Sequence, residues 1–102
     1  MNIEKIDKDT TPGLYAFIKL NLHHSSLSPV KWNDGYGHSY GVKLSNEKSL
    51  REFFGFEPKG IVARIDDGMI ELFYPEYFSD FELICKKYEE KYGKEVTLRY
   101  WE

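Results

Sequence analysis

The dipeptide Asp67-Gly68 separates two runs of alternating apolar and polar residues, and no other feature limits the possible folds of this chain as strongly. The two runs are Ile61–Asp66 and Met69–Tyr74. Asp-Gly between alternating segments is typical of a two-residue type I′ turn, whose backbone twist matches that of the strands it joins. The sequence therefore predicts an antiparallel hairpin with its turn centred on this dipeptide.

The turn also predicts the register of the hairpin. Arg64 lies opposite Glu71 on one face, beside Val62 and Phe73. The other face is almost wholly apolar and consists of Ile61, Ala63, Ile65, Ile70, Leu72 and Tyr74. Because a slip of one residue would exchange the two faces, we expect helices to cover the apolar face and Arg64 and Glu71 to point away from them.

Three further segments alternate in the manner of half-buried strands, namely residues 14–22, 36–44 and 96–101. In the first of them Tyr15 and Phe17 lie on the face opposite to the apolar one. In the second, glycine and serine occupy one face, and side chains this small leave room for another backbone or a ligand. We expect all three segments to join the hairpin in one sheet.

Two segments have the periodicity of amphipathic helices. A short apolar stripe at residues 50–54 predicts the first helix. The second is predicted to begin at a capping box formed by Ser79 and Glu82 and to end at Gly93. Residues 24–35 contain serine, proline, asparagine and glycine and are predicted to be a long loop, the kind of segment that often carries function.

These elements follow one another in the order ββαββαβ. A chain of 102 residues fits a single domain, here residues 1–102, with residues 1–11 as a loose N-terminal segment. Each strand has one strongly apolar face, and both helices are amphipathic. The economical arrangement is an α+β fold with a single mixed sheet of about five strands and two helices packed on one face.

The uncovered face of such a sheet would be rich in aromatic and cationic side chains. Trp, Tyr and Arg most often dominate the binding energy of protein interfaces, so this open sheet face is the first candidate site. The predicted loop adds a tryptophan and an aspartate to it. The candidate partner-binding residues are Tyr15, Phe17, Trp32, Asp34, Arg64, Glu71, Phe73, Arg99 and Trp101.

The open face has alternative occupants within the chain itself. The N-terminal segment or the loop at 24–35 could fold over it, or two copies of the chain could meet there as a homodimer. Trp32 has an alternative of its own, because it can pack back as a plug of a small core instead of facing a partner.

Three histidines form a second candidate. If the first two alternating segments pair as a hairpin, His23, His24 and His38 meet at one loop mouth near Asp34. They could then act in a small hydrolase or nuclease. However, adjacent histidines on a strand point to opposite faces, and His38 lies on the apolar face, where a core histidine is more common than a functional one. The sequence has no H-E-x-x-H, C-x-x-C or paired zinc spacing, so we predict no catalytic site, no metal and no cofactor.

Charge and composition limit the classes of partner and the cellular location that fit this sequence. The formal net charge is −3, and the acidic excess lies after residue 59. Duplex DNA is therefore a poor partner, because its affinity depends on neutralising phosphates, and a basic protein is the better prediction. No run approaches the roughly 18 apolar residues of a membrane helix, and the first ten residues do not have the pattern of a signal peptide. The single cysteine, Cys85, allows no internal disulfide and fits a reduced, cytoplasmic location.

The leading functional hypothesis is a small cytoplasmic binding module that inhibits a partner protein by occluding it. Immunity proteins, antitoxins and phage-encoded inhibitors are small, mildly acidic and free of catalytic motifs in the same way. The alternative is a protein that binds single-stranded nucleic acid on the sheet face. Bases would then stack on its aromatic rings, and phosphates would meet Lys19, Lys43, Arg64 and Arg99.

Overall fold

A computed structural model describes residues 3–4, 13–23, 26–33, 35, 37–45 and 60–101 of the chain. In these ranges the helices and strands are, in chain order, β1 (Ile3–Glu4), α1 (Gly13–Asn21), β2 (Leu27–Asn33), β3 (His38–Leu44), β4 (Ile61–Asp66), β5 (Met69–Leu72), the 3-10 helix η1 (Pro75–Tyr77), α3 (Phe78–Tyr92) and β6 (Thr97–Tyr100).

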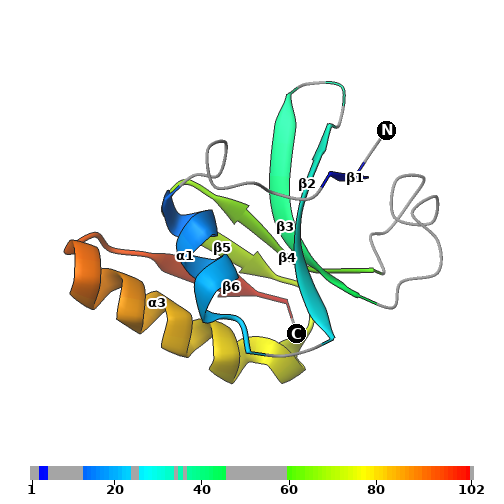
Figure 1. The fold of residues 1–102 in the computed structure, drawn as a ribbon. Helices are drawn as coiled ribbons and strands as arrows, with labels where there is room; N and C mark the ends of the chain where they lie inside the picture. The colour runs from blue at the N-terminus through cyan, green and yellow to red at the C-terminus, as the bar shows by residue number, and fades with distance from the viewer. Residues whose placement is uncertain are drawn as a thin grey trace.

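The strands form one six-stranded sheet in the order β1-β2-β3-β4-β5-β6. Neighbouring strands are antiparallel except for β5 and β6, which are parallel and are connected through α3. Both α1 and α3 lie on the same side of the sheet (Figure 1). The predicted fold class, α+β with a single mixed sheet and two helices on one face, is confirmed.

The β4–β5 hairpin has the predicted register, with its turn centred on Asp67-Gly68, but the predicted turn type is wrong. A type I′ turn needs a positive φ at both central residues, and Asp67 does not have one. Asp66 pairs with Met69 across the turn, and of the two central residues only Gly68 has a positive φ, 74°. Arg64 pairs with Glu71, and the residues beside them on each strand, Ala63, Ile65, Ile70 and Leu72, lie in the core under the helices. Arg64 and Glu71 therefore point away from the helices, as predicted from the Asp-Gly turn.

The first predicted strand is wrong, because residues 13–21 form helix α1. Its buried residues are Leu14, Tyr15, Phe17 and Ile18, which is the i, i+1, i+3, i+4 spacing of one helix face. Alternate residues of the segment are apolar as well, so its pattern satisfies both periods, and periodicity alone does not separate them in a short apolar run.

The predicted loop at 24–35 is also corrected, because residues 27–33 form β2 and pair with β3 along its whole length. Pro29 and the serines favoured a loop in the sequence. The proline is tolerated because β1 pairs with β2 only at Lys31 and Trp32. At Pro29 the strand is an edge strand in the described part of the sheet, and an edge strand can dispense with one N–H donor.

Ile61 departs from the predicted apolar face. Val42 of β3 pairs with Ala63, but the next residue, Lys43, pairs with Ile61, so Val62 is an extra residue in β4. This β-bulge reverses the alternation at the start of the strand. As a result Val62 joins the core under the helices, and Ile61 joins a smaller cluster with Val30 and Trp32.

Helix α3 ends as predicted and begins differently. Gly93 caps its C-terminus with a φ of 64°, and its amide donates to the carbonyl of Glu89. The expected capping box is wrong, because α3 continues directly from η1. Its N-cap is Tyr77, which makes no side-chain hydrogen bond that caps the helix. The helix predicted around residues 50–54 lies outside the described residues, and of residues 1–11 only Ile3–Glu4, which form β1, lie within them.

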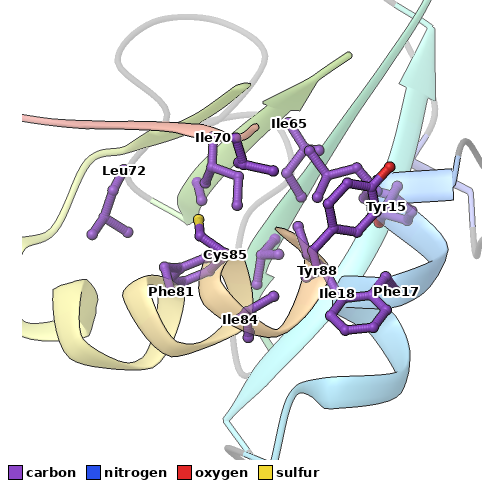
Figure 2. Packing of buried hydrophobic residues seen from close by; sticks show 14 of the residues in the cluster. Tyr15, Phe17, Ile18, Ile65, Ile70, Leu72, Phe81, Ile84, Cys85 and Tyr88 are labelled. Carbon is purple, nitrogen blue, oxygen red and sulfur yellow. The ribbon is translucent and has the colours of Figure 1, made fainter. Parts of the chain in front are cut away.

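The main core lies between the two helices and the sheet. Phe81, Ile84, Cys85 and Tyr88 from α3 point toward the strands, and Figure 2 shows Ile65, Ile70 and Leu72 above them. α1 packs beside α3, where the ring of Phe17 meets Tyr88 at 5.4 Å and Tyr92 at 5.9 Å in edge-to-face contacts.

Candidate binding face of the sheet

Five of the predicted partner-binding residues lie together on the face of the sheet that the helices leave uncovered. Arg64 of β4 pairs with Glu71 of β5, and Glu71 pairs in turn with Arg99 of β6. Three side chains on adjacent strands, about 4.8 Å apart, therefore form one row across the sheet. Phe73 and Trp101 come two residues after Glu71 and Arg99 and lie beside this row. We call Arg64, Glu71, Phe73, Arg99 and Trp101 the β4–β6 patch.

Trp101 is the most exposed aromatic side chain of the patch. Its side chain is 55% exposed, although its backbone N–H donates to the carbonyl of Leu72 at 3.1 Å and so continues the parallel ladder past the end of β6. The indole Nε1 donates to Oε1 of Glu71 at 3.0 Å. This hydrogen bond orients the ring over the sheet face, so the indole is held in place and still offers a large apolar surface to solvent.

The patch has a positive local charge although the chain is acidic. Arg64 and Arg99 are exposed, and neither forms an ion pair with any residue that the structure describes. The carboxylate between them accepts the hydrogen bond from Trp101. Two guanidinium groups without an ion-pair partner among the described residues flank one carboxylate that accepts the indole N–H, so the row has the chemistry to bind a further anionic group.

Trp32 does not face a partner. Its side chain is only 4% exposed and packs with Val30, Ile61 and the half-buried Phe73. A Cβ atom built on Gly41 would lie 2.9 Å from Cζ3 of Trp32, so the indole fills the hollow that we expected a ligand or another backbone to occupy. The alternative in which Trp32 plugs a small core agrees with the structure.

Tyr15 and Phe17 are buried on α1, so their predicted place on the open sheet face is wrong. The Tyr15 hydroxyl lies 2.7 Å from the carbonyl oxygen of Val30 and 2.8 Å from that of Gly41, and shares its proton between these two acceptors. Burial, and to a smaller extent the neighbouring Tyr40, raises the pKa of Tyr15 far above its usual range. Both rings therefore contribute to stability and are inaccessible to a partner.

The structure does not bring together His23 and His38, the two histidines that it describes. His38 pairs with Asn33 at the turn end of the β2–β3 hairpin, whereas His23 follows α1 and precedes Leu27, which pairs with Leu44 at the other end. Six residue steps along a strand separate these ends by roughly 20 Å. His38 is also exposed, not a core residue. His24 and Asp34 lie outside the described residues.

A pocket of about 240 Å³ lies between the end of α1 and the first turns of α3. The sequence did not predict it, because it exists only if residues 13–21 are a helix. Its apolar wall is accompanied by one histidine, one carboxylate and one amine. The lining residues are Asn21, Leu22, His23, Asp80, Leu83, Ile84 and Lys87. It is smaller than the roughly 300–1,000 Å³ of typical small-molecule sites, so we treat it as a surface hollow.

Metal-binding clusters and membrane-spanning helices are both absent from the described residues. No group of three or more His, Cys, Asp or Glu side chains in this part of the chain is arranged to hold a metal ion. None of the helices found there is long and apolar enough to cross a membrane.

Comparison with known proteins assigns neither a family nor a function to this chain. No protein-family model, no curated protein and no solved structure matches this chain.

Proposed function

We propose that this chain is a non-catalytic, cytoplasmic binding module that docks on a partner protein through the β4–β6 patch and occludes part of its surface, in the manner of an immunity protein, an antitoxin or a phage-encoded inhibitor. The observation that carries the proposal is the geometry of Trp101, an indole that is 55% exposed yet oriented by Glu71 and flanked by Arg99.

An exposed tryptophan with this orientation has the physical properties of an interface anchor. The hydrogen bond to Glu71 already orders the two side-chain torsions of Trp101. Binding therefore costs less conformational entropy than it would for a freely rotating ring. The neighbouring Phe73 is half-buried against the smaller cluster of Val30, Trp32 and Ile61, and it extends the apolar area that a partner would cover. Arginines beside an aromatic anchor are typical of the residues that dominate binding energy.

The structure weakens the argument for single-stranded nucleic acid. Stacking of successive bases needs several exposed rings along the path of the strand. Tyr15, Phe17 and Trp32 are buried, which leaves Trp101 as the one strongly exposed ring of the patch. Lys19 lies on α1, on the other side of the sheet from Arg64 and Arg99, so the four cations do not form a common path.

The experiment is an affinity capture from a lysate of the source cells treated with nuclease, followed by mass spectrometry. Wild type is compared with Trp101→Ala, Arg99→Glu and the control Leu83→Ala. Leu83 is 53% exposed, close to the exposure of Trp101, but lies on the helix side of the sheet. The control therefore removes a similar exposed apolar group from a different surface.

We expect one protein to be retained by wild type and by Leu83→Ala and to be depleted by both patch variants. Loss of an anchor typically weakens binding by roughly 1–3 kcal/mol, which is about 5- to 150-fold. Retention by all four proteins, loss on nuclease treatment, or recovery of nothing but a second copy of this chain would each contradict the proposal.

A further inference from the structure

Strand β6 is an unpaired edge of the described sheet. It pairs with β5 alone, and it stands at one end of the strand order. Three of its four residues, Thr97, Arg99 and Tyr100, are exposed. Edge strands of soluble proteins are protected by being short, by charged side chains, by a proline or a bulge, or by a covering segment, and of these β6 has a short length and one charged residue, Arg99. β6 has no proline, and its pairing with β5 has no register shift.

The hydrogen bonds of β6 show which backbone groups are unused. Thr97 N–H donates to the carbonyl of Gly68 at 3.0 Å, and Trp101 N–H donates to that of Leu72 at 3.1 Å. In a parallel pair alternate residues of a strand direct both their N–H and their C=O toward the neighbour. Thr97, Arg99 and Trp101 therefore bond to β5, and the N–H and C=O groups of Leu98 and Tyr100 point outward.

The side chains along this edge are chemically different on the two faces. On the face of the β4–β6 patch, Arg99 is exposed between Thr97 and Trp101, with Arg64 in the same row. On the helix face, Leu98 packs on the main core, and the ring of Tyr100 meets Phe78 at 4.7 Å in an edge-to-face contact. A strand added here would meet Arg99 on one face and apolar groups on the other, whereas Arg64 on β4 lies three strand spacings away, roughly 14 Å.

We infer that β6 accepts an extended segment of the partner protein as an additional strand, with acidic side chains on the Arg99 face and apolar side chains on the Leu98 and Tyr100 face. Charge complementarity decides the sign: Arg99, the charged residue of β6 itself, has no carboxylate partner in the described chain, whereas Glu71 on β5 accepts the Trp101 hydrogen bond. The inference rests on the proposed function and specifies how the partner is held. Such β-augmentation uses main-chain hydrogen bonds for affinity and alternate side chains for specificity.

The first test measures amide hydrogen exchange by NMR, with a capped octapeptide of alternating valine and glutamate as the probe. In the free protein we expect the outward amides of Leu98 and Tyr100 to exchange faster than that of Arg99. Saturation with the peptide should slow the exchange of Leu98 and Tyr100 by at least about tenfold, because each gains a hydrogen bond. A peptide of alternating valine and lysine is the control and should leave both amides unchanged.

The second test uses a matched pair of variants, Tyr100→Pro and Tyr100→Ala. Both remove the ring, but only proline removes the outward N–H, and an edge strand tolerates proline where no ladder bond is lost. Circular dichroism and unfolding midpoints verify that both are folded. We expect the proline variant to bind the valine–glutamate peptide about 3- to 10-fold more weakly than the alanine variant. Arg99→Glu should reverse the preference toward the valine–lysine peptide.

These outcomes separate the inference from the proposed function. If the peptide leaves Leu98 and Tyr100 unprotected, or if the proline and alanine variants bind it equally, strand addition at β6 is excluded. The capture experiment with Trp101→Ala and Arg99→Glu still decides the proposed function, because a partner can dock on the β4–β6 patch without adding a strand.

Discussion

At the scale of single residues, the packing of Trp32 on Gly41 fills part of the sheet face opposite the helices. The indole of Trp32 occupies the space that a side chain at position 41 would need, and the carbonyl of Ala63 approaches from the neighbouring strand. This arrangement turns an apparent hollow in the sequence into a packed cluster with Val30 and Ile61.

Substitution Gly41→Ala is therefore expected to destabilise the protein. The new Cβ would lie 2.6 Å from the carbonyl oxygen of Ala63 and 2.9 Å from Cζ3 of Trp32, so a strand or a buried ring must shift. Overpacking of this kind costs about 1–3 kcal/mol, which urea unfolding would measure. Gly13→Ala is the control, because its nearest contact is 3.8 Å away and alanine favours the helix. Equal stability of Gly41→Ala and wild type would contradict the close packing of Trp32 on Gly41.

Cys85 is a second residue whose behaviour follows from its surroundings. Burial, and then the nearby Glu89, raises the pKa of its thiol to about 11 from an ordinary 9.0. At pH 8 the thiolate fraction is therefore about a hundredfold lower than for an ordinary thiol. We expect iodoacetamide to label Cys85 at least that much more slowly in the native protein than in urea, and comparable rates would show that the thiol is accessible.

The same shift has a consequence for stability at high pH. The native state favours the neutral thiol, so this contribution to the free energy of unfolding is complete below pH 9 and is lost as the pH rises from 9 toward about 11. Burial of Tyr15 acts in the same direction, since its pKa is also raised. Unfolding midpoints measured across this range should fall with pH, and a Cys85→Ala variant should fall less.

At the scale of elements, α1 shows why a periodic pattern can be misread. Alternate positions in residues 14–22 are apolar, but so are the positions that a helix would bury. The choice is made by contacts far away in the sequence: Tyr15 bonds the carbonyls of Val30 and Gly41, and Phe17 packs against α3. Nine residues are too few for intrinsic propensity to decide without this packing.

The β4–β5 turn is the opposite case, because its chemistry is local. Gly68 has a φ of 74°, which a residue with a Cβ adopts only at a cost of about 1–2 kcal/mol. Gly68→Ala should lower the free energy of unfolding by about that amount, although the nearest contact of the new Cβ would be an ordinary 3.9 Å. Gly68→Asn should lose less, because asparagine tolerates this conformation. If alanine and asparagine cost the same, backbone strain is not the cause.

At the scale of the whole molecule, residues on the two faces of the sheet beside β6 differ in burial. Leu72 is fully buried under α3, whereas Trp101, beside it in space, is more than half exposed on the other face. Leu72→Ala should lower the free energy of unfolding by about 2–5 kcal/mol, as core truncations do. Trp101→Ala should cost less than about 1 kcal/mol, since it loses one exposed hydrogen bond. Should Trp101→Ala destabilise as much as Leu72→Ala, the indole belongs to a core, and the β4–β6 patch is not a binding face.

The net charge of the whole chain is negative, whereas the local charge of the β4–β6 patch is positive. The net charge of −3 predicts a basic partner through long-range steering, and that remains a prediction. Arg64 and Arg99 of the β4–β6 patch have no ion-pair partner among the described residues, so at short range we expect the patch to favour an acidic segment. Partner capture at two salt concentrations distinguishes these effects, because screening weakens the long-range contribution first.

Much of the candidate site is specified by local sequence. An Asp-Gly turn admits few backbone conformations, so it sets the β4–β5 register and places Arg64, Glu71 and Phe73 on one face. A regular alternation then places Arg99 and Trp101 beside them once β6 joins the sheet. Tertiary contacts decide the rest: the helical state of Tyr15 and Phe17, the bulge that moves Ile61, and the burial of Trp32 on Gly41. Each depends on groups far apart in the chain, whose packing energy exceeds the small local preference that a short, ambiguous pattern expresses.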